Sequence, residues 1–248
     1  MKPRLLRAAG LAVAVASALT YGLLDPLAWP ARAFTTFLLV PLPAILVLQT
    51  RLVHLLPEDG DREAVYLSSA VSVWTLAAAA MLASRFSGFT RADLWLTSPA
   101  VPTLLGAAAA TVAGGAALMA AARILHVRET PLIRFLLPRT GSEKIAFAGL
   151  SVSAGIAEEL VFRAFLMAAL LAAGATVPLT IALSVAAFAV SHAYQGMVGM
   201  IRVALLGALL TAPVLLTGSI YPAMIAHAAL DLLAGLVLAD WLAGEPDH

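Results

Sequence analysis

Long apolar runs divide this 248-residue sequence and constrain its fold more than any other feature. A helix needs about 20 apolar residues to cross roughly 30 Å of hydrocarbon. Hydrophobic residues make up 62% of the chain, charged residues only 12%, and the mean hydropathy is +0.96, a composition typical of an integral membrane protein. We predict an all-α polytopic membrane helix bundle of about eight transmembrane helices, at residues 5–24, 34–50, 64–84, 99–122, 145–173, 177–193, 199–217 and 219–241.

Lysine and arginine are distributed unequally between the two sets of connections. If the N-terminus is inside, eleven of them lie in inner segments and three in outer ones, as the preference of basic residues for the cytoplasmic side requires. We therefore expect a multi-pass protein with cytoplasmic N- and C-termini. The alanine-rich composition and the lack of a eukaryotic targeting signal favour the bacterial plasma (inner) membrane. The inner residues are Lys2, Arg4, Arg7, Arg51, Arg62, Arg123, Arg128, Arg134, Arg139, Lys144 and Arg202; the outer ones are Arg32, Arg85 and Arg91.

The apolar runs and the basic residues together predict four parts of the chain. Residues 1–122 hold four transmembrane helices, 123–144 a basic cytoplasmic loop, 145–241 four more helices, and 242–248 a short tail. The apolar patch 132–137 in the loop either lies along the inner leaflet or belongs to a solvated connector. The first run is a retained helix or, alternatively, a signal peptide. A net charge of +1 gives no argument for a nucleic-acid partner, and the oligomeric state stays open.

Three ionisable residues interrupt the fifth apolar run: Glu158, Glu159 and Arg163. A charged side chain at mid-membrane depth costs about 3 kcal/mol, so these groups need partners, a polar cavity or a function. On a helix Glu159 and Arg163 share a face, whereas Glu158 is rotated about 100° away. We predict that Arg163 neutralises Glu159 and that Glu158 has no local partner. A purely structural network that holds helices in register is the alternative.

Thr140 and Glu143 have the spacing of a capping box, which predicts that this helix starts near Gly141 or Ser142. At about 1.5 Å per residue, Glu158 then lies about 20–25 Å from the helix start. An unpaired carboxylate at that depth bears its full desolvation penalty. Glu158 therefore requires a group from another helix.

Two later helices carry further ionisable groups. His192 follows Phe188 by one turn in the sixth predicted helix, and His227 precedes Asp231 by one turn in the eighth. Each histidine taken alone is compatible with a satisfied core or interfacial residue. The first four predicted helices carry essentially no such groups in their interiors, and convergence of the late ones with Glu158 in one cavity explains that asymmetry.

Such a cavity supports hydrolysis by activated water. A carboxylate in apolar surroundings, close to an imidazole, can take a proton from water and deliver it to a leaving amine. Glu158 with His192 suits this task, and His227 can hold the oxyanion of a tetrahedral intermediate. No serine has the context of a nucleophile, and no cysteine is present. No cofactor is expected. A metal site built from the two histidines with Glu158 and Asp231 is an alternative that no His-Glu-x-x-His motif supports.

Three motifs in chain order resemble those of the CPBP family, also called ABI or CAAX-protease-and-bacteriocin-processing: Glu158-Glu159-x-x-x-Arg163, Phe188-x-x-x-His192 and His227-x-x-x-Asp231. The resemblance covers about residues 140–241. It implies a metal-independent intramembrane endopeptidase similar to the CAAX prenyl endopeptidases, with eight helices and a conical cavity. Its expected substrate is a membrane-embedded or lipidated peptide.

The resemblance also implies roles for the individual residues. Glu158 and His192 look like the water-activating pair, with Glu159 and Arg163 as supports. His227 and position 231 would form the oxyanion site. The prenyl endopeptidases have asparagine where this chain has Asp231, and an ionised carboxylate cannot donate a hydrogen bond to an oxyanion. Asp231 is then either protonated or a carboxylate partner that orients His227.

Two other functions remain open at this point. The same family includes members without demonstrated proteolysis, so a non-catalytic membrane scaffold or bacteriocin-immunity protein is the main alternative. A transporter with a proton-relay Glu158 is disfavoured, because the two halves of the sequence show no two-fold relation.

Overall fold

The computed structural model describes residues 3–50, 60–125 and 130–238, and these residues form helices and no strands. The prediction of an all-α fold is confirmed. In chain order the helices are α1 (Pro3–Leu23), α2 (Trp29–Leu39), α3 (Pro41–Gln49), α4 (Arg62–Phe86), α5 (Val101–Ile124), α6 (Pro131–Phe135), α7 (Gly141–Glu159), η2 (Leu160–Leu166), α8 (Met167–Ala172), α9 (Val177–Ser191), η3 (Ala193–Gln195), α10 (Gly196–Thr217), α11 (Tyr221–Leu232) and η4 (Leu233–Val237).

Within the described residues, four helical segments are long and apolar enough to cross a membrane: Trp29–Gln49, Arg62–Phe86, Val101–Ile124 and Ala193–Thr217. Three shorter apolar helices, Arg7–Leu23, Val177–Ser191 and Tyr221–Val237, join them. With the continuous helix formed by α7, η2 and α8, the set agrees with about eight transmembrane helices. Leucine and valine side chains face outward on these helices, as contact with lipid requires.

Prolines and caps set many of the helix starts. Proline occupies the first turn of α2, α3, α5, α6, α9 and α11, where its missing N–H is not needed. The predicted helix 34–50 is divided in the structure, because α2 ends at Leu39 and a new helix, α3, begins at Pro41. The predicted capping box is confirmed: the Thr140 side chain accepts the N–H of Glu143, whose carboxylate accepts the N–H of Thr140. Helix α7 accordingly begins at Gly141.

The most deeply buried part of the chain is the segment that carries Arg163. Helix η2 is a π-helix, and it continues α7 into α8 without a break. Phe165 is fully buried there, with its ring 5.3 Å from that of Phe34 and 6.4 Å from that of Phe89. Short π segments inside α-helices are frequent at functional sites. The chain thus places an irregular turn directly after the two glutamates.

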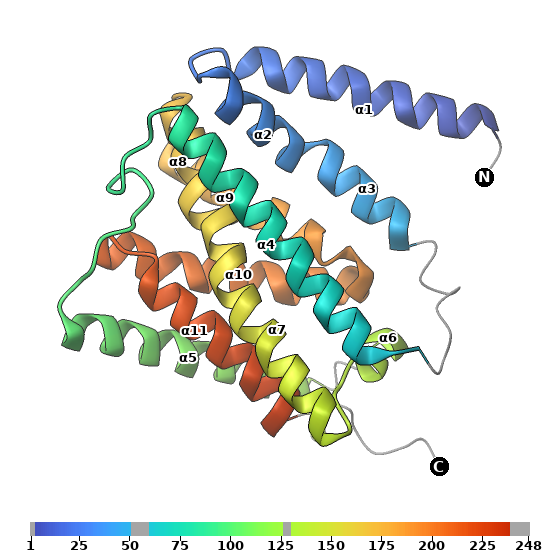
Figure 1. Cartoon of the computed structure of the whole chain (residues 1–248), viewed down its shortest axis with the longest axis vertical. Helices are drawn as coiled ribbons and strands as arrows, with labels where there is room; N and C mark the ends of the chain where they lie inside the picture. Colours follow the sequence, from blue (N-terminus) through green and yellow to red (C-terminus); the bar gives the residue numbers. More distant parts are fainter. Residues whose placement is uncertain (1–2, 51–59, 126–129, 239–248) are drawn as a thin grey trace.

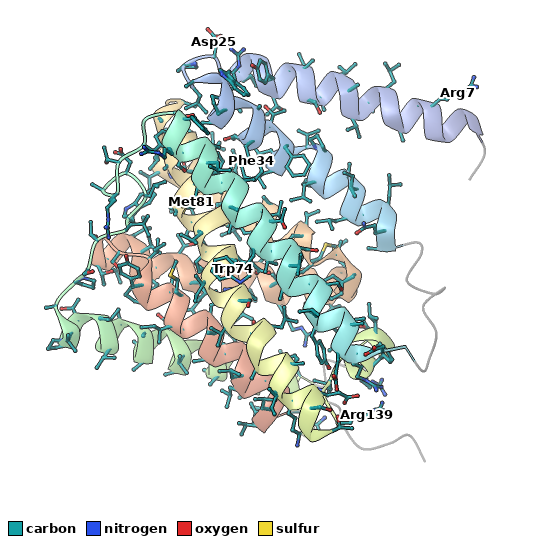
Figure 2. All side chains as sticks on the ribbon, viewed as in Figure 1. Arg7, Asp25, Phe34, Trp74, Met81 and Arg139 are labelled. Atoms are coloured by element: carbon teal, nitrogen blue, oxygen red, sulfur yellow. The ribbon has the colours of Figure 1, made fainter. Side chains whose placement is uncertain are left out.

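Helices α4, α7 and α11 form the part of the bundle that positions the site. Figure 1 shows α4 and α7 side by side. Helix α11 packs along α7, and α5 packs against α11. Helix α1 lies at the edge and packs chiefly on α2 and α3, with Arg7 near one end and Asp25 in the turn beyond the other (Figure 2). The helices that carry the three motifs therefore lie away from the edge helix.

Several predictions concern residues outside the described ranges. These are the basic residues Lys2, Arg51 and Arg128, the end of the predicted eighth helix at 239–241, and the tail 242–248.

Candidate active site

The predicted pair of Glu159 and Arg163 is present and fully buried. Nη1 of Arg163 donates to Oε1 of Glu159 at 3.0 Å, and both side chains have 0% exposure. Nη2 of Arg163 donates to the carbonyl of Gly207 at 3.0 Å, and the guanidinium lies 4.3 Å from the centre of the Phe188 ring. A buried arginine held by charge, by a main-chain acceptor and by an aromatic face has little freedom to move. The pair forms a rigid support behind the site.

Gly207 leaves the room that this arginine occupies. A methyl group on Gly207 would lie 3.2 Å from Nη2 of Arg163 and 3.0 Å from Cδ1 of Phe188. The carbonyl of Gly207 also accepts the Thr211 hydroxyl at 2.8 Å. Helix α10 can therefore approach the charged pair only where it has no side chain.

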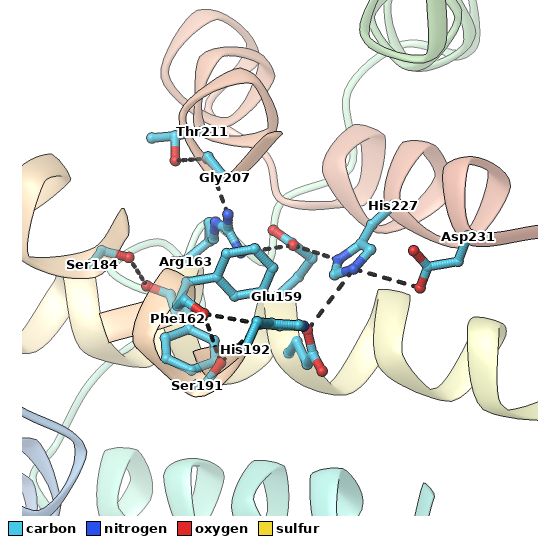
Figure 3. A network of polar contacts seen from close by, with 12 residues as sticks. Glu159, Phe162, Arg163, Ser184, Ser191, His192, Gly207, Thr211, His227 and Asp231 are labelled. Atoms are coloured by element: carbon cyan, nitrogen blue, oxygen red, sulfur yellow. Dashed lines mark hydrogen bonds and ion pairs between the residues drawn. The ribbon is translucent and has the colours of Figure 1, made fainter. Parts of the chain in front are cut away.

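His227 connects the buried pair to the remaining carboxylates. Its Nδ1 lies 2.9 Å from Oε1 of Glu159, and its Nε2 lies 3.8 Å from Oε2 of Glu158 and 3.7 Å from Oδ2 of Asp231 (Figure 3). Because Glu159 is ion-paired with Arg163, it accepts this hydrogen bond, and Nδ1 carries the proton. Nε2 therefore faces two carboxylates. Both of these distances are in ion-pair range and longer than a hydrogen bond.

Glu158 lies on a different face of α7 from Glu159, as the helical spacing predicts. Its Oε2 atom is buried and has no hydrogen-bond partner in the described part of the chain. Of the two histidines that the sequence offers as partners of Glu158, His227 lies at ion-pair distance from it, and His192 lines the same cavity. The physical reason is the close approach of α7 and α11, where a methyl group on Gly155 would lie 2.6 Å from the backbone nitrogen of Ala228.

His192 ends α9 and is held at Nδ1. Its Nδ1 lies 2.9 Å from the carbonyl of Phe188 and 3.1 Å from the hydroxyl of Ser191, which itself donates to the same carbonyl. A carbonyl only accepts, so Nδ1 of His192 donates this hydrogen bond. The imidazole centre lies 4.9 Å from the Phe188 ring and 5.9 Å from the Tyr194 ring. The ring orientation of His192 is therefore fixed by its Nδ1 side.

One cavity of about 960 Å³ collects these groups. Glu158, His192, His227 and Asp231 all line it, whereas Glu159 and Arg163 stand behind its wall. The expected convergence of the late-helix motifs is therefore present. Most of the remaining lining is apolar, contributed by α4, α5, α6, α7, α10 and α11. In the described part of the chain, no group of three or more His, Asp or Glu side chains is arranged to hold a metal ion.

Gly155 and Gly207 position the site, and neither role was predicted from the sequence. Ser151 and Gly155 form a small-xxx-small spacing, which indicates a close helix contact in membranes and could have drawn attention to α7. The spacing does not name the helix on the other side. Only the fold shows that the contact is made with Ala228, next to His227.

The fold and the cavity define a multi-pass membrane protein with a buried ionisable site. Residues 140–233 match the family model for Type II CAAX prenyl endopeptidase Rce1-like. This region contains all three motifs, and the match confirms the resemblance to the CPBP family of CAAX proteases. At the level of the family it supports a CAAX-type intramembrane protease, with peptidase activity in general. No curated protein and no solved structure matches the chain.

Proposed function

We propose that this protein is an intramembrane endopeptidase that hydrolyses a peptide bond with water activated by Glu158 and histidine, without a metal ion. The observation that carries the proposal is the meeting of Glu158, His192, His227 and Asp231 in one cavity between membrane helices. Burying these ionisable groups in a mostly apolar cavity costs free energy, and clusters of this kind are typical of functional sites.

The hydrolysis would begin with removal of a proton from water. The Glu158 carboxylate takes the proton while the water oxygen bonds to the carbonyl carbon of the substrate, and the carbonyl electrons move to its oxygen. When the tetrahedral intermediate collapses, the carbon–nitrogen bond breaks and the proton passes from Glu158 to the leaving amine. Nε2 of the neutral His192 imidazole orients the water by accepting its second proton in a hydrogen bond. Atoms and charge balance, with a carboxylic acid and an amine as products.

The oxyanion would be held by His227. With Nδ1 committed to Glu159, a protonated Nε2 is the atom that can donate towards the cavity. Asp231 lies 3.7 Å from this nitrogen and, as a carboxylate, attracts its N–H. Asp231 therefore acts as the partner that orients His227, which assigns it a different role from the asparagine of the prenyl endopeptidases.

The substrate that fits this site is a membrane-embedded or lipidated, CAAX-like peptide. The cavity is large enough for an apolar chain beside the scissile bond, and its walls are mostly apolar. In this proposal residues 145–241 are the catalytic core and residues 1–122 its membrane support, joined by the loop 123–144. Both termini would face the cytoplasm from the plasma membrane, as the basic residues indicate.

Substitution Glu158→Gln tests the proposal. The amide keeps the shape of the side chain but cannot take a proton, so the cleavage rate of a prenylated reporter peptide should fall about a thousand-fold. The assay uses purified protein in detergent and detects the released fragment by mass spectrometry. Glu63→Gln is the matched control, because Glu63 is exposed in the first turn of α4 and does not line the cavity. It should cleave at the wild-type rate.

The alternatives give different results in the same assay. Wild-type cleavage by Glu158→Gln would refute the catalytic assignment, and full biological function of that variant would favour a non-catalytic scaffold or immunity protein. Cleavage that a chelator abolishes and a divalent metal restores would instead favour a metal-dependent membrane hydrolase. We expect the rate to be unchanged by chelator.

A further inference from the structure

Residues 130–137 cross the end of the bundle at which α4 and α7 begin. The Thr130 hydroxyl accepts the N–H of Ile133 and caps the start of the short helix α6. Five apolar side chains of this stretch line the same cavity as Glu158: Leu132, Ile133, Phe135, Leu136 and Leu137. This stretch, here termed the strap, forms one wall of the candidate active site.

Two side chains of α4 hold the strap by its main chain. Nε of Arg62 donates to the carbonyl of Phe135 at 2.6 Å, and its guanidinium lies 4.5 Å from the centre of that phenyl ring. The hydroxyl of Tyr66 donates to the carbonyl of Leu136 at 2.9 Å, while its ring packs edge-on against Phe147 at 5.5 Å. Both acceptors belong to the backbone, so the strap is attached at two adjacent residues of its C-terminal half.

The other half of the strap meets the corner that follows His192. A methyl group on Gly196, at the start of α10, would lie 3.8 Å from Cγ2 of Thr130. Only η3 separates His192 from this glycine. The strap therefore runs from α4 and α7 to the turn that carries His192, across one end of the cavity.

We propose that the strap is a gate, which Arg62 and Tyr66 hold against the bundle and whose release widens the cavity and admits a peptide segment. A five-residue helix has little stability of its own, so its position depends on the groups to which it is attached. Arg62 and Tyr66 are positioning residues in this arrangement, since they act through the strap. The identity of what enters rests on the proposed function, whereas the opening itself can be measured without any cleavage.

Thiol labelling measures this opening directly, because the chain contains no cysteine. Ser151 lines the cavity and is 1% exposed, so a cysteine in its place should react with a maleimide chiefly when the cavity opens. In the S151C background, Tyr66→Phe removes one hydrogen bond and keeps the ring. It should raise the labelling rate about five-fold, and combining it with Arg62→Gln should raise the rate further.

Ser84 provides the matched control for general loosening. It is 2% exposed, it makes the same kind of hydroxyl bond to the carbonyl four residues earlier, and it lies on α4 about 27 Å from Tyr66. The labelling rate of S84C should not change with either substitution. Unchanged labelling of S151C, or an equal rise at S84C, would overturn the gate, and neither outcome bears on the effect of Glu158→Gln. Faster labelling of S151C alone supports it.

Discussion

The close approach of α7 and α11 at Gly155 offers the sharpest test of how the fold sets the site. A methyl group at this position would lie 2.6 Å from the backbone nitrogen and 2.8 Å from Cβ of Ala228. Carbon atoms prefer separations of about 3.5–4.0 Å, so Gly155→Ala should push the two helices apart by about 1 Å. The contacted atoms are backbone and Cβ, which cannot rotate away.

This displacement acts on the residues next to the contact. His227 precedes Ala228, and its bond to Glu159 should lengthen from 2.9 Å to about 3.9 Å, beyond hydrogen-bonding range. Misplacement of about 1 Å can lower a rate about a hundred-fold, so we expect that loss in cleavage of the reporter peptide. Overpacking should also lower the free energy of unfolding by about 1–3 kcal/mol, measured by thermal unfolding in detergent.

Gly149→Ala is the matched control on the same helix. A methyl group on Gly149 meets no atom within 4 Å, so this substitution should leave cleavage unchanged and stabilise the helix by about 1 kcal/mol. If Gly155→Ala cleaves and unfolds as Gly149→Ala does, the helix contact does not set the geometry of the site and the reasoning is wrong.

Three further substitutions test other parts of the structure. Arg163→Met leaves Glu159 buried without its counter-charge and should destabilise the fold by about 3–5 kcal/mol, a loss that the double variant with Glu159→Gln should largely recover in thermal unfolding. Asp231→Asn should lower cleavage about ten-fold, equivalent to about 1.4 kcal/mol, because His227 loses a carboxylate partner; a faster variant would instead favour the asparagine-like oxyanion role. In the loop after α4, hydrogen bonds from the hydroxyl and N–H of Thr90 lower the pKa of Asp93. The folded pKa is thus below the unfolded value, so wild type should be more stable than Asp93→Asn at neutral pH, and the difference should vanish as the pH falls below about 4, as followed by unfolding against pH.

Local features of the fold were predictable because their causes lie within a few residues of one another. The capping box of Thr140 and Glu143 and the pair of Glu159 and Arg163 depend on spacings of three and four residues on one helix. The π-helix that follows Glu159 was not predicted, since no spacing in the sequence marks it. The split of residues 34–50 into two helices had a signal in Pro41, which the length of the apolar run obscured.

By itself the sequence determined that the helices lie in a membrane, where each helix approximately begins and ends, and which of two adjacent glutamates is neutralised by an arginine. Composition, proline position and helical periodicity are local properties, and they need no knowledge of neighbouring helices. The tertiary structure decided that Glu158 meets His227, that Gly155 and Gly207 are the points of close approach, and that the strap crosses the cavity. Those facts depend on contacts between residues far apart in the chain, such as Glu159 and His227, which no spacing along one helix encodes.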